Sequence, residues 1–85
     1  MSFIVITGQI VGGNGRPFKT VWSSDMERKR TLKGAIRHGF KTRGSDDFRI
    51  GEIYGEWLKS VSWMSEKEFD ESEVSETAEQ LGLQT

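Results

Sequence analysis

The chain has 85 residues, a net charge of −1 and no cysteine. This length fits one domain with a modest core, and the lack of cysteine excludes disulfides, thiolate metal sites and cysteine nucleophiles from this chain. The charge is unevenly divided, because residues 1–64 carry eleven Lys or Arg against six Asp or Glu, whereas residues 65–85 carry one against seven. We therefore expect a basic core over residues 1–64 and an acidic C-terminal helix or tail over residues 65–85.

The N-terminal run FIVITGQIV is rich in β-branched residues, and both of its alternating sides are largely apolar. This pattern predicts a central strand that is covered on both faces. Nine residues are far too few for a membrane span, which needs about 20. In the following GGNGRP, Asn14-Gly15 predicts a tight turn because both residues tolerate positive φ. The segment FKTVW over 18–22 then alternates like a second strand, so we predict a β-hairpin rather than a phosphate-binding loop.

A helix is predicted next, because Ser24 and Glu27 have the spacing of a capping box. Apolar residues then recur at helical spacing and predict a buried stripe, made of Leu32, Ala35, Ile36 and Phe40. His38-Gly39-Phe40 predicts the end of the helix, with Gly39 in the left-handed conformation and Phe40 folded back on the last turn. His38 is the single histidine of the chain, and at a helix C-terminus it would interact favourably with the helix dipole.

The segments DFRIGEI and WLKSVSWM flank Tyr54-Gly55-Glu56 and predict a second hairpin. We expect the large aromatic residues of the strands to pack in the core rather than to stack on bases: Trp22, Phe48, Trp57 and Trp63. In the tail, Val74, Ala78 and Leu81 are spaced for a short helix. The predicted fold class is α+β, a small single domain with two antiparallel β-hairpins around one helix (ββαββ) plus a short C-terminal helix.

The stretch from Arg28 to Arg43 holds seven Lys or Arg residues and no Asp or Glu. Like charges four residues apart on a helix repel by a few tenths of a kcal/mol per pair, so an unmixed positive face indicates an anionic partner, although a plain solvated face stays open. The partner can be nucleic-acid phosphate, an acidic protein surface or the chain's own acidic tail, in cis or across a dimer. The predicted partner-binding residues are Arg30, Lys33, Arg37, Lys41 and Arg43.

The sequence offers few groups for catalysis, and we expect no enzyme, no cofactor and no metal site. His38 has no Ser or Asp at a spacing that indicates a catalytic triad. Carboxylates that could transfer protons or bind magnesium surround the predicted third strand, namely Asp46, Asp47, Glu52 and Glu56. Nothing in the sequence brings two of them together in one cleft. A small enzyme that uses Asp46, Asp47 or Glu52 is therefore the least favoured alternative.

In its length, its two hairpins around one capped helix and its charged tail SEVSETAEQLGLQT, the chain resembles the small accessory proteins encoded by bacteriophages, including the anti-CRISPR group. The resemblance is one of architecture and carries no motif. It implies a non-enzymatic protein that docks on a host protein or nucleoprotein complex and modulates it. From the lack of cysteine and of a membrane-spanning segment, we expect a cytoplasmic protein. The alternative is nucleic-acid binding by the same basic face, with the acidic tail as a modulator. The doubly apolar first strand permits a homodimer, and no membrane contact is expected.

Overall fold

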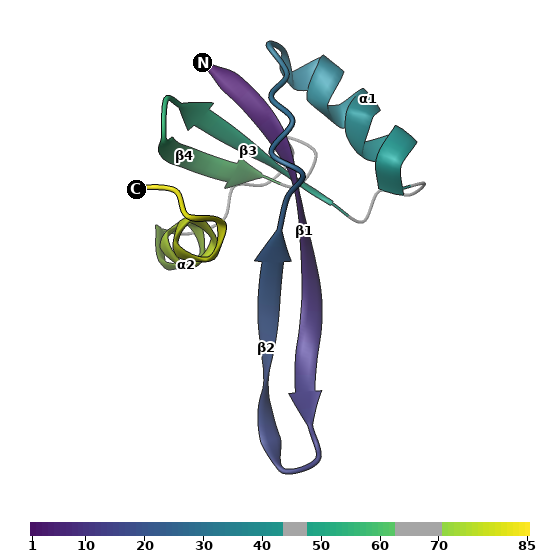
Figure 1. Cartoon of the computed structure of the whole chain (residues 1–85), viewed down its shortest axis with the longest axis vertical. Helices are drawn as coiled ribbons and strands as arrows, with labels where there is room; N and C mark the ends of the chain where they lie inside the picture. The colour runs from purple at the N-terminus through teal and green to yellow at the C-terminus, as the bar shows by residue number, and fades with distance from the viewer. Residues whose placement is uncertain (44–47, 63–70) are drawn as a thin grey trace.

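The computed structural model describes residues 1–43, 48–62 and 71–85, which form four strands and two helices (Figure 1). In chain order the elements are β1 (Ser2–Gly13), β2 (Arg16–Ser23), α1 (Leu32–Arg43), β3 (Arg49–Tyr54), β4 (Trp57–Ser62) and α2 (Glu71–Leu81). The strands lie in the order β2-β1-β3-β4, and each neighbouring pair is antiparallel. The α+β class predicted from the sequence is confirmed.

The two helices pack on opposite faces of the sheet (Figure 1). On one face, Ile4 and Ile6 of β1 join Ala78 of α2 in a buried cluster. On the other face, Val5 packs in a second buried cluster with Ala35 of α1. The N-terminal half of β1 is thus covered on both faces, as its doubly apolar pattern predicted.

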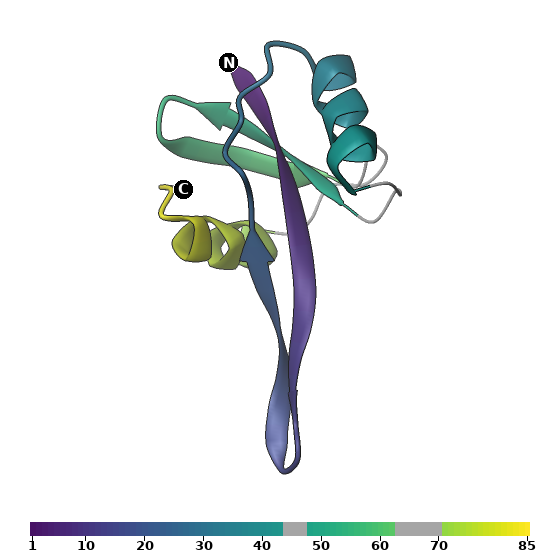
Figure 2. The same cartoon turned by 45° about the vertical axis from the view of Figure 1, so that its right-hand side comes forward.

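The C-terminal half of β1 has a different environment. It pairs with β2 and forms a hairpin that projects beyond both helices (Figures 1 and 2). Asn14 and Gly15 form its two-residue turn with φ of 54° and 87°, which confirms the turn prediction. Ile10, in contrast, is 72% exposed, so the prediction of two covered faces is wrong for this half of the strand. We call residues 8–21 the arm.

Helix α1 begins later than predicted, at Leu32. The Thr31 hydroxyl accepts a hydrogen bond from the Gly34 amide at 3.0 Å and caps the helix. The expected cap, Ser24, instead accepts from the Met26 amide at 3.0 Å in a turn where Met26 has a φ of 58°. The capping-box prediction was wrong because the Ser24 and Asp25 side chains accept hydrogen bonds from nearby amides in a turn, a conformation that these residue types favour as well as helix N-termini.

The predicted end of α1 was also wrong, since the helix continues through Gly39 to Arg43. Gly39 has no left-handed φ, and it is buried in the core. A Cβ at this position would lie 2.4 Å from Cε2 of Phe48, so glycine here permits close packing rather than a turn. Phe40 is 46% exposed and meets Phe48 edge to face at 5.4 Å instead of folding back on the helix.

The second hairpin joins β3 to β4 through a turn in which Gly55 has a φ of 59°. Ile53 pairs with Leu58 and Glu52 pairs with Ser60, so Lys59 is the extra residue of a β-bulge. The bulge places Leu58 in the core and leaves Trp57 53% exposed. The predicted core position of Trp57 is therefore wrong, whereas Phe48 is buried and Trp22 packs against the core beside α2. Trp63 lies outside the described residues.

Helix α2 contributes to the core and also protects the two edges of the sheet. The Gln80 side chain accepts a hydrogen bond from the Trp22 amide at 2.7 Å and donates one to the Thr20 carbonyl at 3.2 Å. Just beyond the helix, the Gln84 carbonyl accepts from the Leu58 amide at 2.7 Å at the edge of β4. The exposed backbone of both edge strands is thus partly satisfied by one C-terminal segment. Neither described helix has the length and apolarity that a transmembrane helix needs.

Candidate functional site

Three of the predicted partner-binding residues form a row along the exposed side of α1. Lys33, Arg37 and Lys41 are separated by steps of four residues and are all exposed. Such steps advance about 6 Å along a helix, so the row spans about 12 Å. None of the three makes an ion pair with any carboxylate in the described ranges. The structure therefore presents a row of cations that is open to solvent.

The two remaining predicted residues flank this row in sequence, but Arg43 faces another side of α1, because two residues turn a helix by about 200°. It lines a hollow together with Thr7 and Asp25. Arg30 is exposed and precedes α1, because the helix begins only at Leu32. Arg43 is exposed in the last turn of the helix, where a cation interacts favourably with the helix dipole. We use the term basic face for Arg30, Lys33, Arg37, Lys41 and Arg43.

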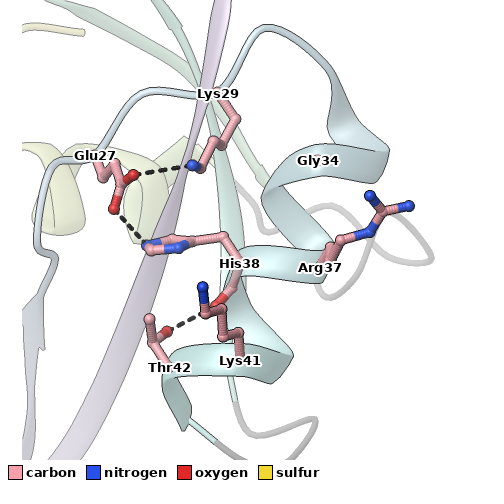
Figure 3. Close-up of a pocket in the computed structure, with 7 residues that line it drawn as sticks. All are labelled: Glu27, Lys29, Gly34, Arg37, His38, Lys41 and Thr42. Carbon is pink, nitrogen blue, oxygen red and sulfur yellow. Dashed lines mark hydrogen bonds and ion pairs between the residues drawn. The ribbon is translucent and has the colours of Figure 1, made fainter.

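His38 lies beside the basic face in the middle of α1, so its predicted position at a helix C-terminus was wrong. Its side chain is only 10% exposed, and Nε2 lies 2.7 Å from Oδ2 of Asp25 and 3.2 Å from Oε2 of Glu27. The same Glu27 carboxylate accepts a hydrogen bond from the Lys29 ammonium at 2.9 Å (Figure 3). These contacts fasten the segment before α1 to the side of the helix. Backbone hydrogen bonds of 2.8 Å between Lys29 and Phe3 attach the same segment to β1.

The two carboxylates of this cluster are stabilised in their charged forms. Partial burial alone would raise the pKa of Asp25, but the hydrogen bond from the Glu27 amide and the interactions with His38 and Lys29 together lower it below its ordinary 3.8. The hydrogen bond from Lys29 is the main cause that lowers the pKa of Glu27 below its ordinary 4.5, and the charge of His38 adds to it. Both residues are therefore ionised at neutral pH.

Asp25, Glu27 and His38 also offer three metal-ligand atoms within 4.8 Å of one another. A divalent cation would have to replace the hydrogen bonds of His38 and sit close to the Lys29 ammonium, which contacts Glu27. Lys29, Arg37 and Lys41 also line the open hollow of about 460 Å³ next to this cluster. Arg37 points away from His38 there, whereas Lys29 points toward Glu27 (Figure 3). These cations oppose a metal, so we assign the cluster a structural role.

Charge is divided unevenly along the chain. Residues 1–43 hold nine Lys or Arg against Asp25 and Glu27 alone, whereas residues 44–85 hold three against eleven Asp or Glu. The exposed carboxylates of Glu73, Glu76 and Glu79 belong to α2, which packs on the face opposite α1. The sheet thus separates these carboxylates from the basic face, and within one molecule they do not neutralise it.

The carboxylates suggested for catalysis are not gathered around an acid–base centre in the described residues. Glu52 on β3 accepts hydrogen bonds from Ser60 at 3.2 Å and from Tyr54 at 3.4 Å. Asp46 and Asp47 lie outside the described residues. Glu56 is exposed in the β3–β4 turn. The basic face and the His38 cluster are therefore the groupings that the structure defines.

Sequence reasoning missed the carboxylate partners of His38 because Asp25 and Glu27 were assigned to a helix that does not form there. It also missed the projecting arm. The available signals were the high glycine content of residues 8–15 and the lack of any Asp or Glu before Asp25. Comparison with protein-family models, with curated proteins and with solved structures found no match. A functional proposal must therefore depend on the geometry and charge of this chain.

Proposed function

We propose that this protein is a non-catalytic binding module that docks on an anionic surface of a larger macromolecule through the basic face. The observation that supports this proposal is the row of Lys33, Arg37 and Lys41, which is exposed and makes no ion pair within the described residues. Cations left without internal partners are available to a partner of opposite charge, which they attract over a distance of about 10 Å at moderate salt.

We take an acidic surface of a host protein or nucleoprotein complex as the leading partner, in keeping with the resemblance to phage accessory proteins. A rigid helix suits this role, because the five cations are carried on or beside one element that is fixed to the sheet by buried Ala35 and Gly39. Docking on such a surface would change the activity of the partner by covering part of it, and it requires no catalytic group on this chain.

Nucleic acid is the second candidate partner. The charge segregation favours it, because the excess of cations over residues 1–43 is separated from the α2 carboxylates by the sheet. The basic face can then bind phosphates even though the net charge of the chain is −1. The exposed carboxylates of Glu73, Glu76 and Glu79 on α2 would point away from the nucleic acid.

The leading proposal is tested by quantitative pull-down from bacterial lysate with wild type, Arg37→Glu and the triple variant Lys33→Glu/Arg37→Glu/Lys41→Glu. We expect the specific partner to be reduced with the single variant and lost with the triple variant. Lys59→Glu is the matched control for the single variant, because it makes the same change in net charge as Arg37→Glu at an exposed site on β4. Partners that are captured equally by wild type and the triple variant would contradict the proposal.

The second candidate is tested by fluorescence anisotropy with labelled duplex DNA and RNA over a range of salt concentrations. Each lost phosphate contact should reduce the slope of log affinity against log salt by about 0.9. We therefore expect the triple variant to have a slope smaller by about 2.7, and Lys59→Glu to keep the wild-type slope. No binding by wild type at 50 mM salt, a condition chosen to favour phosphate contacts, would dismiss nucleic acid.

A further inference from the structure

The arm exposes large apolar side chains at a distance from the body of the protein. Phe18 is 73% exposed and Ile10 is 72% exposed. Ile10 lies on β1 and Phe18 on β2, and Val21 of β2 is also 38% exposed. Ile10 pairs with Thr20, which is two residues from Phe18 along β2. An isolated two-stranded hairpin is marginally stable by itself. The exposed arm therefore adds little to the stability of the domain, which indicates a role in contacting a partner.

The base of the arm is fixed in direction. The Trp22 ring lies against Gly8, where an added Cβ would come within 2.9 Å of it. On the outer side of β2, Gln80 binds the backbone of Thr20 and Trp22. These contacts attach the arm to α2 at its base, whereas its outer part projects past both helices (Figure 2). The arm is thus presented to a partner from a defined position.

The chemistry of the arm suits a polyanion with a groove. No Asp or Glu occurs before Asp25, and the outer arm carries Arg16 and Lys19. Gln9 and Asn14 are exposed amides of the arm, a side-chain type that pairs with adenine edges. These groups match the recognition chemistry of DNA. The cations can bind phosphates, the amides can bind base edges, and an apolar side chain can contact the thymine methyl group.

We propose that the arm binds double-stranded DNA by inserting into its major groove. The groove is about 12 Å wide and admits a two-stranded β-ribbon, whose strands lie about 4.8 Å apart. Gly12, Gly13 and Gly15 keep the tip narrow, because they place no side chain between the backbone and the groove floor. Arg16 and Lys19 contact phosphates, and Phe18 contacts base edges. This inference rests on nucleic acid as the partner class, the second candidate above.

Other occupants of the arm fit its residues less well. A second copy of the chain, paired arm to arm, would bring Arg16 and Lys19 of both molecules close together, and like charges across paired strands are destabilising. A protein groove would favour a continuous apolar surface, because charged residues are depleted at the centre of such interfaces. In the arm, Lys19 and Thr20 directly follow Phe18 along β2.

The test measures binding of a labelled 20-base-pair duplex by anisotropy for wild type, Arg16→Ala/Lys19→Ala and Phe18→Ala. These positions are exposed, so the variants should remain folded, which circular dichroism checks. We expect the double variant to have a salt slope smaller by about 1.8, since two phosphate contacts are lost. We expect Phe18→Ala to bind about tenfold more weakly with an unchanged slope, because it loses an apolar contact and no charge. Lys59→Ala is the control and should bind like wild type.

Loss of binding in the arm variants, together with tighter binding of duplex DNA than of single strands or RNA, would support the proposal. Wild-type affinity in both arm variants, together with weak binding by the basic-face variant, would overturn it while nucleic acid stayed the partner. Stronger binding of RNA or single strands than of duplex DNA would also overturn it. Absence of DNA binding by wild type would overturn both this inference and the nucleic-acid candidate. Docking on a protein would then be the remaining proposal, which the pull-down tests.

Discussion

At the scale of single residues, Gly39 and Phe48 show how α1 is held against the sheet. Gly39 is buried in the helix, and the edge of the Phe48 ring occupies the space that a side chain at Gly39 would need. Phe48 itself is 1% exposed. Glycine costs an α-helix about 1 kcal/mol relative to alanine, and here the close approach of an aromatic ring offsets that cost.

We expect Gly39→Ala to lower the free energy of unfolding by about 1–3 kcal/mol, because the overpacked Cβ outweighs the gain in helix propensity. Urea denaturation measures the change. Phe48→Leu provides the control background, because a smaller side chain leaves room for the added methyl group. In a double-mutant cycle the cost of Gly39→Ala should shrink in that background. An equal cost in both backgrounds would show that Phe48 is not the obstacle.

The cluster of Asp25, Glu27 and His38 makes the folded protein less stable at acid pH. The folded-state pKa values of both carboxyl groups lie below their ordinary values of 3.8 and 4.5, so the unfolded chain takes up protons first as the pH falls. The stabilisation is fully present above about pH 5 and is lost as the pH falls through the folded-state pKa values. We expect urea midpoints to fall between pH 6 and pH 3, and to fall less in Asp25→Asn/Glu27→Gln.

Glu79→Gln is the control for this pH dependence, because Glu79 is an exposed carboxylate on α2, away from the cluster. It should follow the wild-type decrease in stability. A decrease of the same size in wild type and in Asp25→Asn/Glu27→Gln would show that other groups cause the acid sensitivity.

At the scale of the elements, α2 stabilises the sheet through its contacts with both edges as well as through its apolar side. Val74, Ala78 and Leu81 recur at helical spacing and pack against the cluster that contains Ile4 and Ile6. Thr77 is fully buried and donates a hydrogen bond to the Glu73 carbonyl at 2.7 Å, which satisfies its hydroxyl within the helix. Gln80 then extends from the flank of the helix to the outer edge of β2.

We expect Gln80→Ala to lower the free energy of unfolding by about 1–2 kcal/mol, because two hydrogen bonds to the backbone of β2 are lost. Hydrogen exchange should show faster exchange of the Trp22 amide, which donates to Gln80. Glu79→Ala is the control on the same turn of α2, since its exposed side chain leaves that amide unchanged. Unchanged protection of the Trp22 amide in Gln80→Ala would contradict this role.

At the scale of the whole molecule, β1 connects two regions with different environments. Its N-terminal half lies between the two buried clusters. Its C-terminal half is one strand of the arm, and the longest dimension of the molecule is 42 Å. The sheet also separates a cationic helix from an anionic one. The basic face therefore lies on the side of the sheet opposite the exposed carboxylates of α2, and the arm projects beyond both helices (Figure 2).

We expect a chain that ends at Ser62 to lose cooperative unfolding, because without α2 the side chains of Ile4, Ile6 and Leu58 lose their cover. Thermal denaturation followed by circular dichroism measures this. In the full chain, Ala78→Asp should have a similar effect, since it places a charge in the core. Ser75→Asp on the exposed side of α2 should change stability by less than about 0.5 kcal/mol. A cooperative transition in the shortened chain would show that the sheet and α1 suffice.

The sequence by itself determined the fold class, both hairpin turns and the candidate cations. Turn residues and alternating strands are local signals, because positive φ at Asn14-Gly15 and Gly55 depends on the residues themselves. The row of Lys33, Arg37 and Lys41 was likewise readable, since helical spacing alone places these residues on one side.

Only the tertiary structure decided where α1 begins and ends, what His38 contacts and which half of β1 is covered. Ser24 and Thr31 can both cap a helix, and the choice between them depends on the pairing of Lys29 with Phe3 across the chain. Gly39 stays helical because Phe48, which is distant in sequence, packs against it. Only the half of β1 that lies between the two helices is buried on both faces. Contacts between distant residues set each of these features, and no local pattern encodes them.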